Sequence, residues 1–95
     1  MAKLNWTNQA KNDLIAIAEY IAQDSKKYAR IQIQRIRSRA KQIIPLPESG
    51  RVVPELGDDS IRELILGNYR IIYHIKSKDR VDILTVHHSA KILKL

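Results

Sequence analysis

The sequence predicts an α+β fold in which a helical hairpin packs on one face of a small antiparallel sheet. Apolar residues recur at helical spacing up to Ile43, and the spacing changes to two after Pro47. Short turn signals, such as Gly67-Asn68, then separate the later apolar runs, as in β-hairpins. The predicted order is β-α-α-β-β-β, and 95 residues are enough for one domain that spans residues 1–95.

The first predicted elements are a short strand at Lys3 to Trp6 and a helix of about four turns. Thr7 lies between them and is a residue type that caps helix N-termini. Polar residues separate the members of the apolar stripe, which makes the helix amphipathic. The stripe consists of Ala10, Leu14, Ile17, Ala18, Ile21 and Ala22.

A second helix follows after only two residues, with Ser25 as its predicted cap. The short connection predicts that the two helices form a tight antiparallel hairpin. Pro45 and Pro47 end the second helix, because proline lacks the N–H and excludes α geometry just before it. Its apolar stripe consists of Ala29, Ile33, Ile36, Ala40 and Ile43.

The rest of the chain predicts a meander of strands. The segment ESGRVVPEL is at best an irregular edge strand, since Pro54 cannot lie inside a sheet. IRELIL, YRIIYHIK and RVDILTVHH are the three remaining strands, with turns at Gly67-Asn68 and at residues 77–79. The tail SAKILKL fits a short helix or an extended arm equally well.

The strand YRIIYHIK contains an arginine and a histidine among apolar residues. Alternation places Tyr69, Ile71, Tyr73 and Ile75 on the face under the helices. It places Arg70, Ile72, His74 and Lys76 on the opposite face. Because helices cover one side only, we expect this opposite face to be an open, basic surface.

The amino-acid composition argues against a disordered, a disulfide-rich or a membrane protein. Hydrophobic residues make up 44% and charged residues 28%, which is typical of a globular protein and not of a disordered one. There is no cysteine, no apolar run of membrane-spanning length and no signal peptide, so we expect a cytoplasmic protein without a membrane association.

The net charge of +7 is concentrated in the first half of the chain. Residues 1–47 contain nine basic and three acidic residues, a balance of +6, and no acid occurs from Ser25 to Pro47. Such a charge attracts nucleic acid or an acidic protein. The alternative is an ordinary solvated helix face, which is the more frequent meaning of a charge run.

Five segments in this order resemble the RelE/ParE superfamily of bacterial toxins from type II toxin–antitoxin systems. They are LNWT, DLIAIAEYI, GRVVPEL, IRELILGNYRIIYHI and VDILTVHHSAKIL, which together cover almost the whole chain. The resemblance implies a growth-arresting toxin and a cognate antitoxin, acidic and amphipathic, that wraps it. It also implies one of two targets. RelE-like members cut mRNA in the ribosomal A site, whereas ParE-like members cut nothing and poison DNA gyrase.

The resemblance further implies the residues of a metal-independent endoribonuclease, the activity we favour at this point. Glu55 corresponds to the general base, Arg70 and Arg62 to the cations that stabilise the transition state, and His88 to the general acid. Each also has a structural reading. Arg70 can pair with Glu63 across the hairpin, and Glu55 can be an ordinary loop carboxylate.

Further residues complete the expected site. The predicted contacts to RNA phosphates come from four cations, which are Arg51, Lys91, Arg35 and Arg39. We expect no cofactor and no metal, because adjacent histidines on a strand are poor ligands. Ser89 and Ala90 stand where strongly active nucleases of the superfamily carry an aromatic or basic group, which keeps the gyrase alternative open. A third alternative is a partner without toxicity that only represses transcription with its antitoxin.

Overall fold

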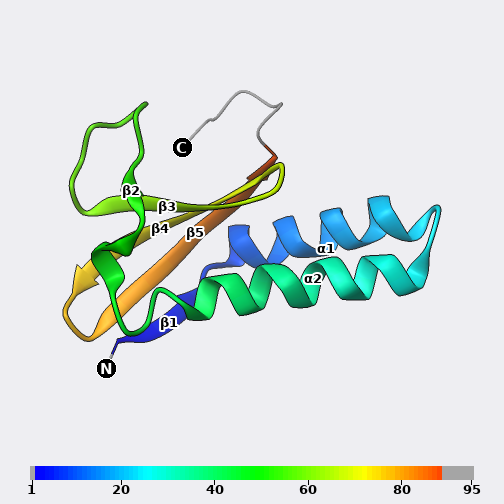
Figure 1. The fold of residues 1–95 in the computed structure, drawn as a ribbon, viewed down its shortest axis with the longest axis horizontal. Helices are drawn as coiled ribbons and strands as arrows, with labels where there is room; N and C mark the ends of the chain where they lie inside the picture. Colours follow the sequence, from blue (N-terminus) through cyan, green and yellow to red (C-terminus); the bar gives the residue numbers. More distant parts are fainter. Residues whose placement is uncertain (1, 89–95) are drawn as a thin grey trace.

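The computed structural model describes residues 2–88, and these form two helices on a five-stranded sheet (Figure 1). The predicted α+β class is confirmed. The elements are β1 (Lys3–Trp6), α1 (Asn8–Ala22), α2 (Lys26–Lys41), a 3-10 turn (Pro47–Ser49), β2 (Arg51–Val52), β3 (Ile61–Leu66), β4 (Tyr69–Ser77) and β5 (Arg80–His88). The predicted edge strand is thus the two-residue β2. The tail 89–95, whose sequence fits a short helix or an extended arm, lies outside the described residues.

The sheet has the order β1-β5-β4-β3-β2 and is mixed. The last three pairings are antiparallel, as predicted, but β1 runs parallel to β5, with Leu4 opposite Val81 and Trp6 opposite Ile83. The expectation of a purely antiparallel sheet was therefore wrong at one edge. A four-residue strand does not specify its direction by alternation, because both directions place the same side chains on the same faces.

Both predicted capping residues, Thr7 and Ser25, are found at the N-termini of α1 and α2. The Thr7 hydroxyl accepts a hydrogen bond from the Ala10 N–H (3.2 Å), and the Ser25 hydroxyl accepts one from the Tyr28 N–H (3.0 Å). Thr7 also donates to the Ile83 carbonyl oxygen (2.7 Å), so the same side chain fixes the start of α1 to the sheet.

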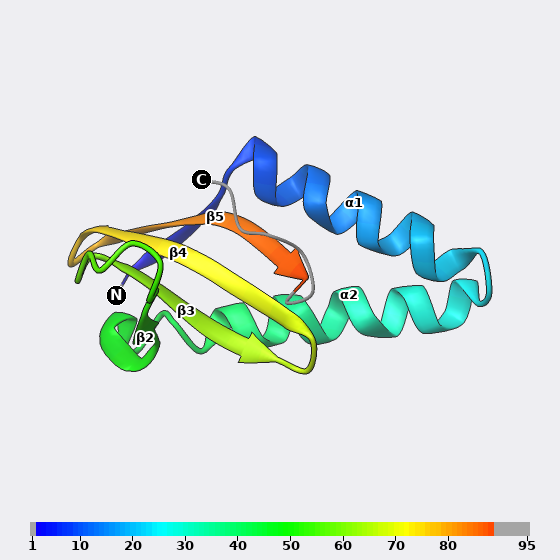
Figure 2. The ribbon, with the colours of Figure 1, turned by 90° about the horizontal axis from the view of Figure 1, so that it is seen from above.

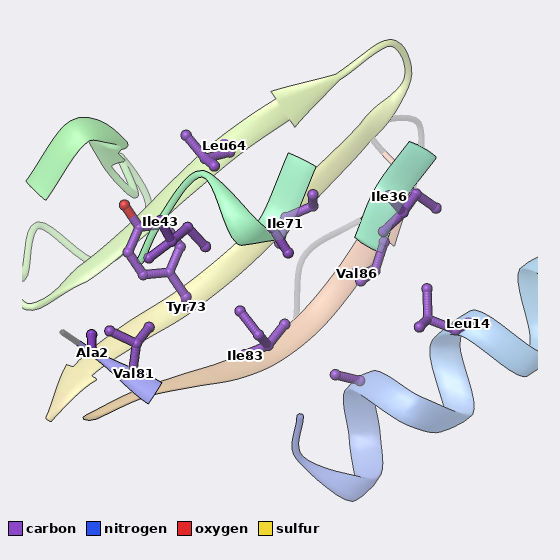
Figure 3. Packing of buried hydrophobic residues seen from close by; sticks show 12 residues of the cluster. Ala2, Leu14, Ile36, Ile43, Leu64, Ile71, Tyr73, Val81, Ile83 and Val86 are labelled. Carbon is purple, nitrogen blue, oxygen red and sulfur yellow. The ribbon is translucent and has the colours of Figure 1, made fainter. Parts of the chain in front are cut away.

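The core lies between the helices and one face of the sheet (Figure 3). Leu14, Ile36 and Ile43 come from the helices and from the turn after α2, and they meet Ile71, Tyr73, Val81 and Ile83. Full burial of each such aliphatic side chain contributes about 1.5–3 kcal/mol. The predicted core face of β4 is confirmed, since Ile71 and Tyr73 are fully buried.

Helix α1 also closes the edge of β5 that β1 leaves uncovered. Asp13 accepts hydrogen bonds from the Val86 N–H (3.0 Å) and the Thr85 hydroxyl (2.5 Å). An unpaired strand edge promotes aggregation, and a covering helix removes that risk. Towards their shared turn, both helices continue past the end of the sheet, as Figures 1 and 2 show. Within residues 2–88, that end of the hairpin lies beyond the strands of the sheet (Figures 1 and 2).

Candidate functional site

Arg70 lies on the face of β4 that points away from the helices, as predicted, but its guanidinium is not open to a ligand. Its Nε donates to Glu63 Oε1 (2.5 Å), while Nη1 and Nη2 donate to Glu55 Oε2 and Oε1 (2.7 and 2.9 Å). Only 12% of its side chain is exposed. The predicted Arg70–Glu63 pair across the hairpin is confirmed, and Glu55 forms a bidentate pair on the outer side.

Glu63 is the centre of this arrangement, with its side chain fully buried. Its second oxygen accepts from Arg51 Nε (2.5 Å), so one arginine holds each side of the carboxylate. A buried carboxylate is stable only when it is paired and hydrogen-bonded. We call Arg51, Glu55, Glu63 and Arg70 the sheet-face network. Two arginines and two carboxylates make it neutral overall.

The sheet-face network shifts the pKa values of Glu55 and Arg70. The hydrogen bonds from Arg70 lower the pKa of Glu55 from 4.5 to about 2. In return Glu55 and then Glu63 raise the pKa of Arg70 above its already high value. Both groups are therefore held in their charged forms. A general base works best with a pKa near the working pH, and Glu55 is far below it.

Arg62 occupies the other face of β3, opposite Tyr73. Its guanidinium donates to three backbone carbonyl oxygens, those of Asp59 (2.9 Å), Glu48 (3.0 Å) and Gly50 (3.1 Å). These bonds fasten the segment before β2 and the loop before β3 to the sheet. Arg62 therefore points away from the sheet-face network, and the two arginines do not converge.

Tyr73, on the helix side of the sheet, also holds the segment before β2. Its buried hydroxyl donates to the Pro47 carbonyl oxygen (2.6 Å) and accepts from the Gly50 N–H (3.1 Å). Burial raises the pKa of the Tyr73 phenol. Gly50 passes so close that a Cβ would lie 2.5 Å from both the Glu63 carbonyl oxygen and the Tyr73 hydroxyl. Only glycine fits there without movement of the backbone.

A β-bulge decides the position of the histidines. Ile72 pairs with Thr85 and Tyr73 with Ile83, so Leu84 is an extra residue in β5. After the bulge His87 lies opposite Arg70, and His88 lies opposite Tyr69 on the helix side. The His88 ring meets the Tyr69 ring edge-on, with 5.5 Å between the centroids. His88 and Arg70 are therefore on opposite faces of the sheet, and the predicted catalytic set is not brought together.

The expected open face is also partly covered. Ile72 and Val53 are fully buried on that side, and the link after β2 carries Glu55 over Arg70. His74 and Asp82 are cross-strand neighbours on this same face. Within residues 2–88 no group of three histidine or acidic residues has a geometry that could hold a metal ion. No helix in that part of the chain is long and apolar enough to cross a membrane.

The predicted phosphate-binding residues are scattered. Arg51 belongs to the sheet-face network, and Arg39 donates from Nε to the Ile65 carbonyl oxygen (3.2 Å) and from Nη1 to Gln42. Arg35 is exposed on α2 beside a shallow hollow that Ile31, Ser38 and Leu66 also line. Lys91 lies outside the described residues.

Sequence reasoning missed a groove between the two helices. It is lined by Ala18, Glu19, Ala22, Lys26, Ala29, Arg30, Ile33, Gln34 and Arg37, and its volume is about 550 Å³. We call this surface the hairpin groove. The helical spacing of the sequence instead predicts that its alanines belong to the apolar stripes of the core. The usable signal was that four of the seven cations between Ser25 and Pro47 fall at positions 26, 30, 37 and 41, which share one side of a helix.

Comparisons with known proteins agree with this fold. The sequence model of a family described as "ParE toxin of type II toxin-antitoxin system, parDE" matches residues 4–93. The chain is 32% identical to the toxin RelE2 of Caulobacter vibrioides over 92 residues, which are 97% of this chain and all of that protein. It also superimposes on a chain from a chromosomal ParDE system of P. aeruginosa, with a TM-score of 0.77 and 25% identity over 93% of this chain and 96% of that one.

Proposed function

We propose, from the premise that this chain belongs to the ParE/RelE family of toxins of type II toxin–antitoxin systems, that it arrests growth by inhibiting DNA gyrase without cutting RNA. The observation that carries the proposal is the sheet-face network. The arginine that a nuclease would present to RNA is bonded through Nε, Nη1 and Nη2 to two carboxylates of the protein itself.

Ribonuclease chemistry without a metal would need an available cation, a base near neutral pKa and an acid on the same side. Arg70 is paired, the pKa of Glu55 is about 2, and His88 lies on the other face of the sheet. Each of the three requirements is thus met poorly by these residues. A toxin that inhibits an enzyme by binding to it needs none of these three groups, because the toxin itself catalyses no reaction.

The matched family and the matched structure also support gyrase inhibition. Both are ParE toxins or ParDE systems by description, and ParE-like members of the superfamily poison gyrase. The helical hairpin offers exposed apolar and aromatic side chains for a protein contact. Tyr20 is 74% exposed, Ile15 56% and Tyr28 51%.

Ribosome-dependent mRNA cleavage is the second candidate, because one curated relative is named RelE2 and because His87, Arg70 and Glu55 gather on one face. In this case Glu55 would have to leave Arg70 when RNA binds. His87, not His88, would then be the histidine near the phosphate.

Two parallel assays with the purified full chain separate the candidates. One measures supercoiling of relaxed plasmid by DNA gyrase, and the other maps cuts in a defined message on translating ribosomes by primer extension. We expect inhibition of supercoiling and an intact message, with Glu55→Gln inhibiting as strongly as the wild type. Discrete cuts in the A-site codon that disappear in Glu55→Gln, together with unaffected gyrase, would overturn the proposal.

A further inference from the structure

The side of α2 that adjoins β3 contains a shallow hollow, which the proposed function does not use. Its volume is about 380 Å³, and Ile31 and Leu66 form its apolar part. The rest of its lining consists of side chains that donate hydrogen bonds, namely Gln34, Arg35, Ser38, Arg39 and Gln42. We call this surface the α2 hollow. It shares only Gln34 with the hairpin groove, so the two surfaces lie on different sides of the same helix.

The donors of the α2 hollow recur at helical spacing. Arg35 and Arg39 are four residues apart, which makes them neighbours on one helix face, about 6 Å apart along the axis. Gln34, Ser38 and Gln42 form a second row with the same spacing. Tyr28, which is 51% exposed, lies two turns before Arg35 and adds a hydroxyl group to this side of the helix. The donors therefore follow α2 for about 21 Å.

The two arginines of the α2 hollow are held differently. Arg39 donates from Nε to the Ile65 carbonyl oxygen (3.2 Å) and from Nη1 to Gln42, and within residues 2–88 its Nη2 has no acceptor. A guanidinium that the fold already orients loses less side-chain freedom when it binds an anion. Arg35 is exposed and takes part in none of the ion pairs among the described residues. Both arginines thus retain donors for an external anion.

The charge around the α2 hollow fits a polyanion. In the part of the chain that the structure describes, no carboxylate lines the hollow, and the sequence has no acid from Ser25 to Pro47. Glu63 of β3 lies on the opposite face of the sheet, where two arginines hold it. Arginine, serine, glutamine and tyrosine side chains are the types that contact nucleic-acid phosphates. A protein interface has an apolar core, for which two aliphatic side chains are few.

We propose that the α2 hollow binds the phosphate backbone of duplex DNA. Arg35 and Arg39 would each face a phosphate, and the neutral donors would bond to the oxygens beside them. The contact recognises charge and not base sequence, because phosphates carry no sequence information. The choice of DNA rather than RNA rests on the proposed function, since gyrase acts on DNA. The contact itself does not require gyrase, so it can be measured with this chain alone.

Binding of a labelled DNA duplex of about 20 base pairs to the purified full chain, followed by fluorescence anisotropy at several salt concentrations, tests the proposal. The hollow variant is Arg35→Gln/Arg39→Gln. The matched control is Arg30→Gln/Arg37→Gln, which removes the same charge from the same helix inside the hairpin groove. Circular dichroism checks the fold. If loss of the bond from Arg39 to Ile65 unfolds the hollow variant, Arg35→Gln is compared with Arg30→Gln instead.

We expect the hollow variant to bind DNA about tenfold more weakly than the matched control at about 0.1 M salt. The slope of log K against log salt should become shallower by about 2, one unit for each lost phosphate contact. Two duplexes of unrelated sequence should bind equally. Equal losses in both double variants would overturn the proposal, as would absence of binding by the wild type or tighter binding of an RNA duplex.

The supercoiling assay separates this inference from the proposed function on which it rests. Loss of DNA binding by the wild type with gyrase still inhibited would overturn the DNA contact alone. Unaffected gyrase, with DNA binding that still depends on Arg35 and Arg39, would overturn gyrase inhibition alone.

Discussion

The sheet-face network and the hairpin groove both contain arginines, but they use them in opposite ways. In the network every arginine faces a carboxylate of the same chain, at 2.5–2.9 Å, and the charges sum to zero. In the groove three cations stand beside an apolar floor, and no ion pair within residues 2–88 involves them. An arginine that stands out in the sequence, such as Arg70, can therefore be fully paired within the chain, while less conspicuous cations on a helix form no ion pair in the described residues. Stability should depend on the first region and binding on the second.

The largest expected effect follows from removal of the buried carboxylate. Glu63→Gln removes the buried negative charge and turns an amide NH2 donor towards either Arg70 or Arg51, so we expect a loss of about 3–5 kcal/mol in the free energy of unfolding. Urea denaturation followed by circular dichroism measures it. Glu48→Gln, at an exposed position, is the matched control and should change stability by less than about 0.5 kcal/mol. A similar small change for both variants would mean that the network does not stabilise the fold.

The Tyr73 hydroxyl should have the next largest effect. Tyr73→Phe leaves the Pro47 carbonyl and the Gly50 N–H unpaired, which costs about 1–3 kcal/mol. The same denaturation experiment on Tyr20→Phe, at a position that is 74% exposed, gives the baseline. If the two variants unfold at the same denaturant concentration, Tyr73 does not anchor the segment before β2.

Acid should weaken the network through Glu55. Its pKa is about 2 in the folded protein and 4.5 ordinarily, so the unfolded chain takes up the proton first. The contribution of Glu55 is therefore complete above about pH 4.5 and is lost as the pH falls towards 2. Melting temperatures from pH 6 to pH 2 should fall more steeply for the wild type than for Glu55→Gln. Parallel curves would show that the Arg70–Glu55 pair carries no stability.

The smallest change in stability is expected in the groove, and its sign is the informative part. Lys26→Glu removes an unfavourable charge from the start of α2, so we expect a gain of about 0.3–1 kcal/mol. Lys41→Glu, in the last turn of the same helix, should lose a similar amount. A loss of stability in Lys26→Glu would indicate that Lys26 serves the fold and not a partner.

Much of the fold could be predicted because local patterns decide it. Thr7 and Ser25 cap the helices, two prolines end the second one, and Gly67-Asn68 forms the predicted hairpin loop, with Gly67 at a φ of +55°. The direction of β1 was not predictable, since four alternating residues fit either orientation. The face assignment held from Tyr69 to Ile75 because the register irregularity of β4 comes only after Ile75, at Lys76.

The candidate site was less predictable for two physical reasons. The bulge at Leu84 shifts the faces of every later residue in β5, and a one-residue shift moved His88 to the helix side. In addition, the partners of Arg70 come from residues 55 and 63. The link that brings Glu55 back is held by the bond from Arg62 Nε to the Asp59 carbonyl oxygen and by turn bonds to the Val53 carbonyl oxygen. Alternation contains no information on such bonds.

The most direct test of the central claim is inhibition of DNA gyrase by purified wild type and Glu55→Gln, read as supercoiling of relaxed plasmid. If binding by the helices arrests growth and the sheet face is structural, both proteins inhibit to the same extent. If neither protein affects gyrase at concentrations that stop translation, or if Glu55→Gln alone is inactive while still folded, the sheet face is the functional centre and this account is contradicted.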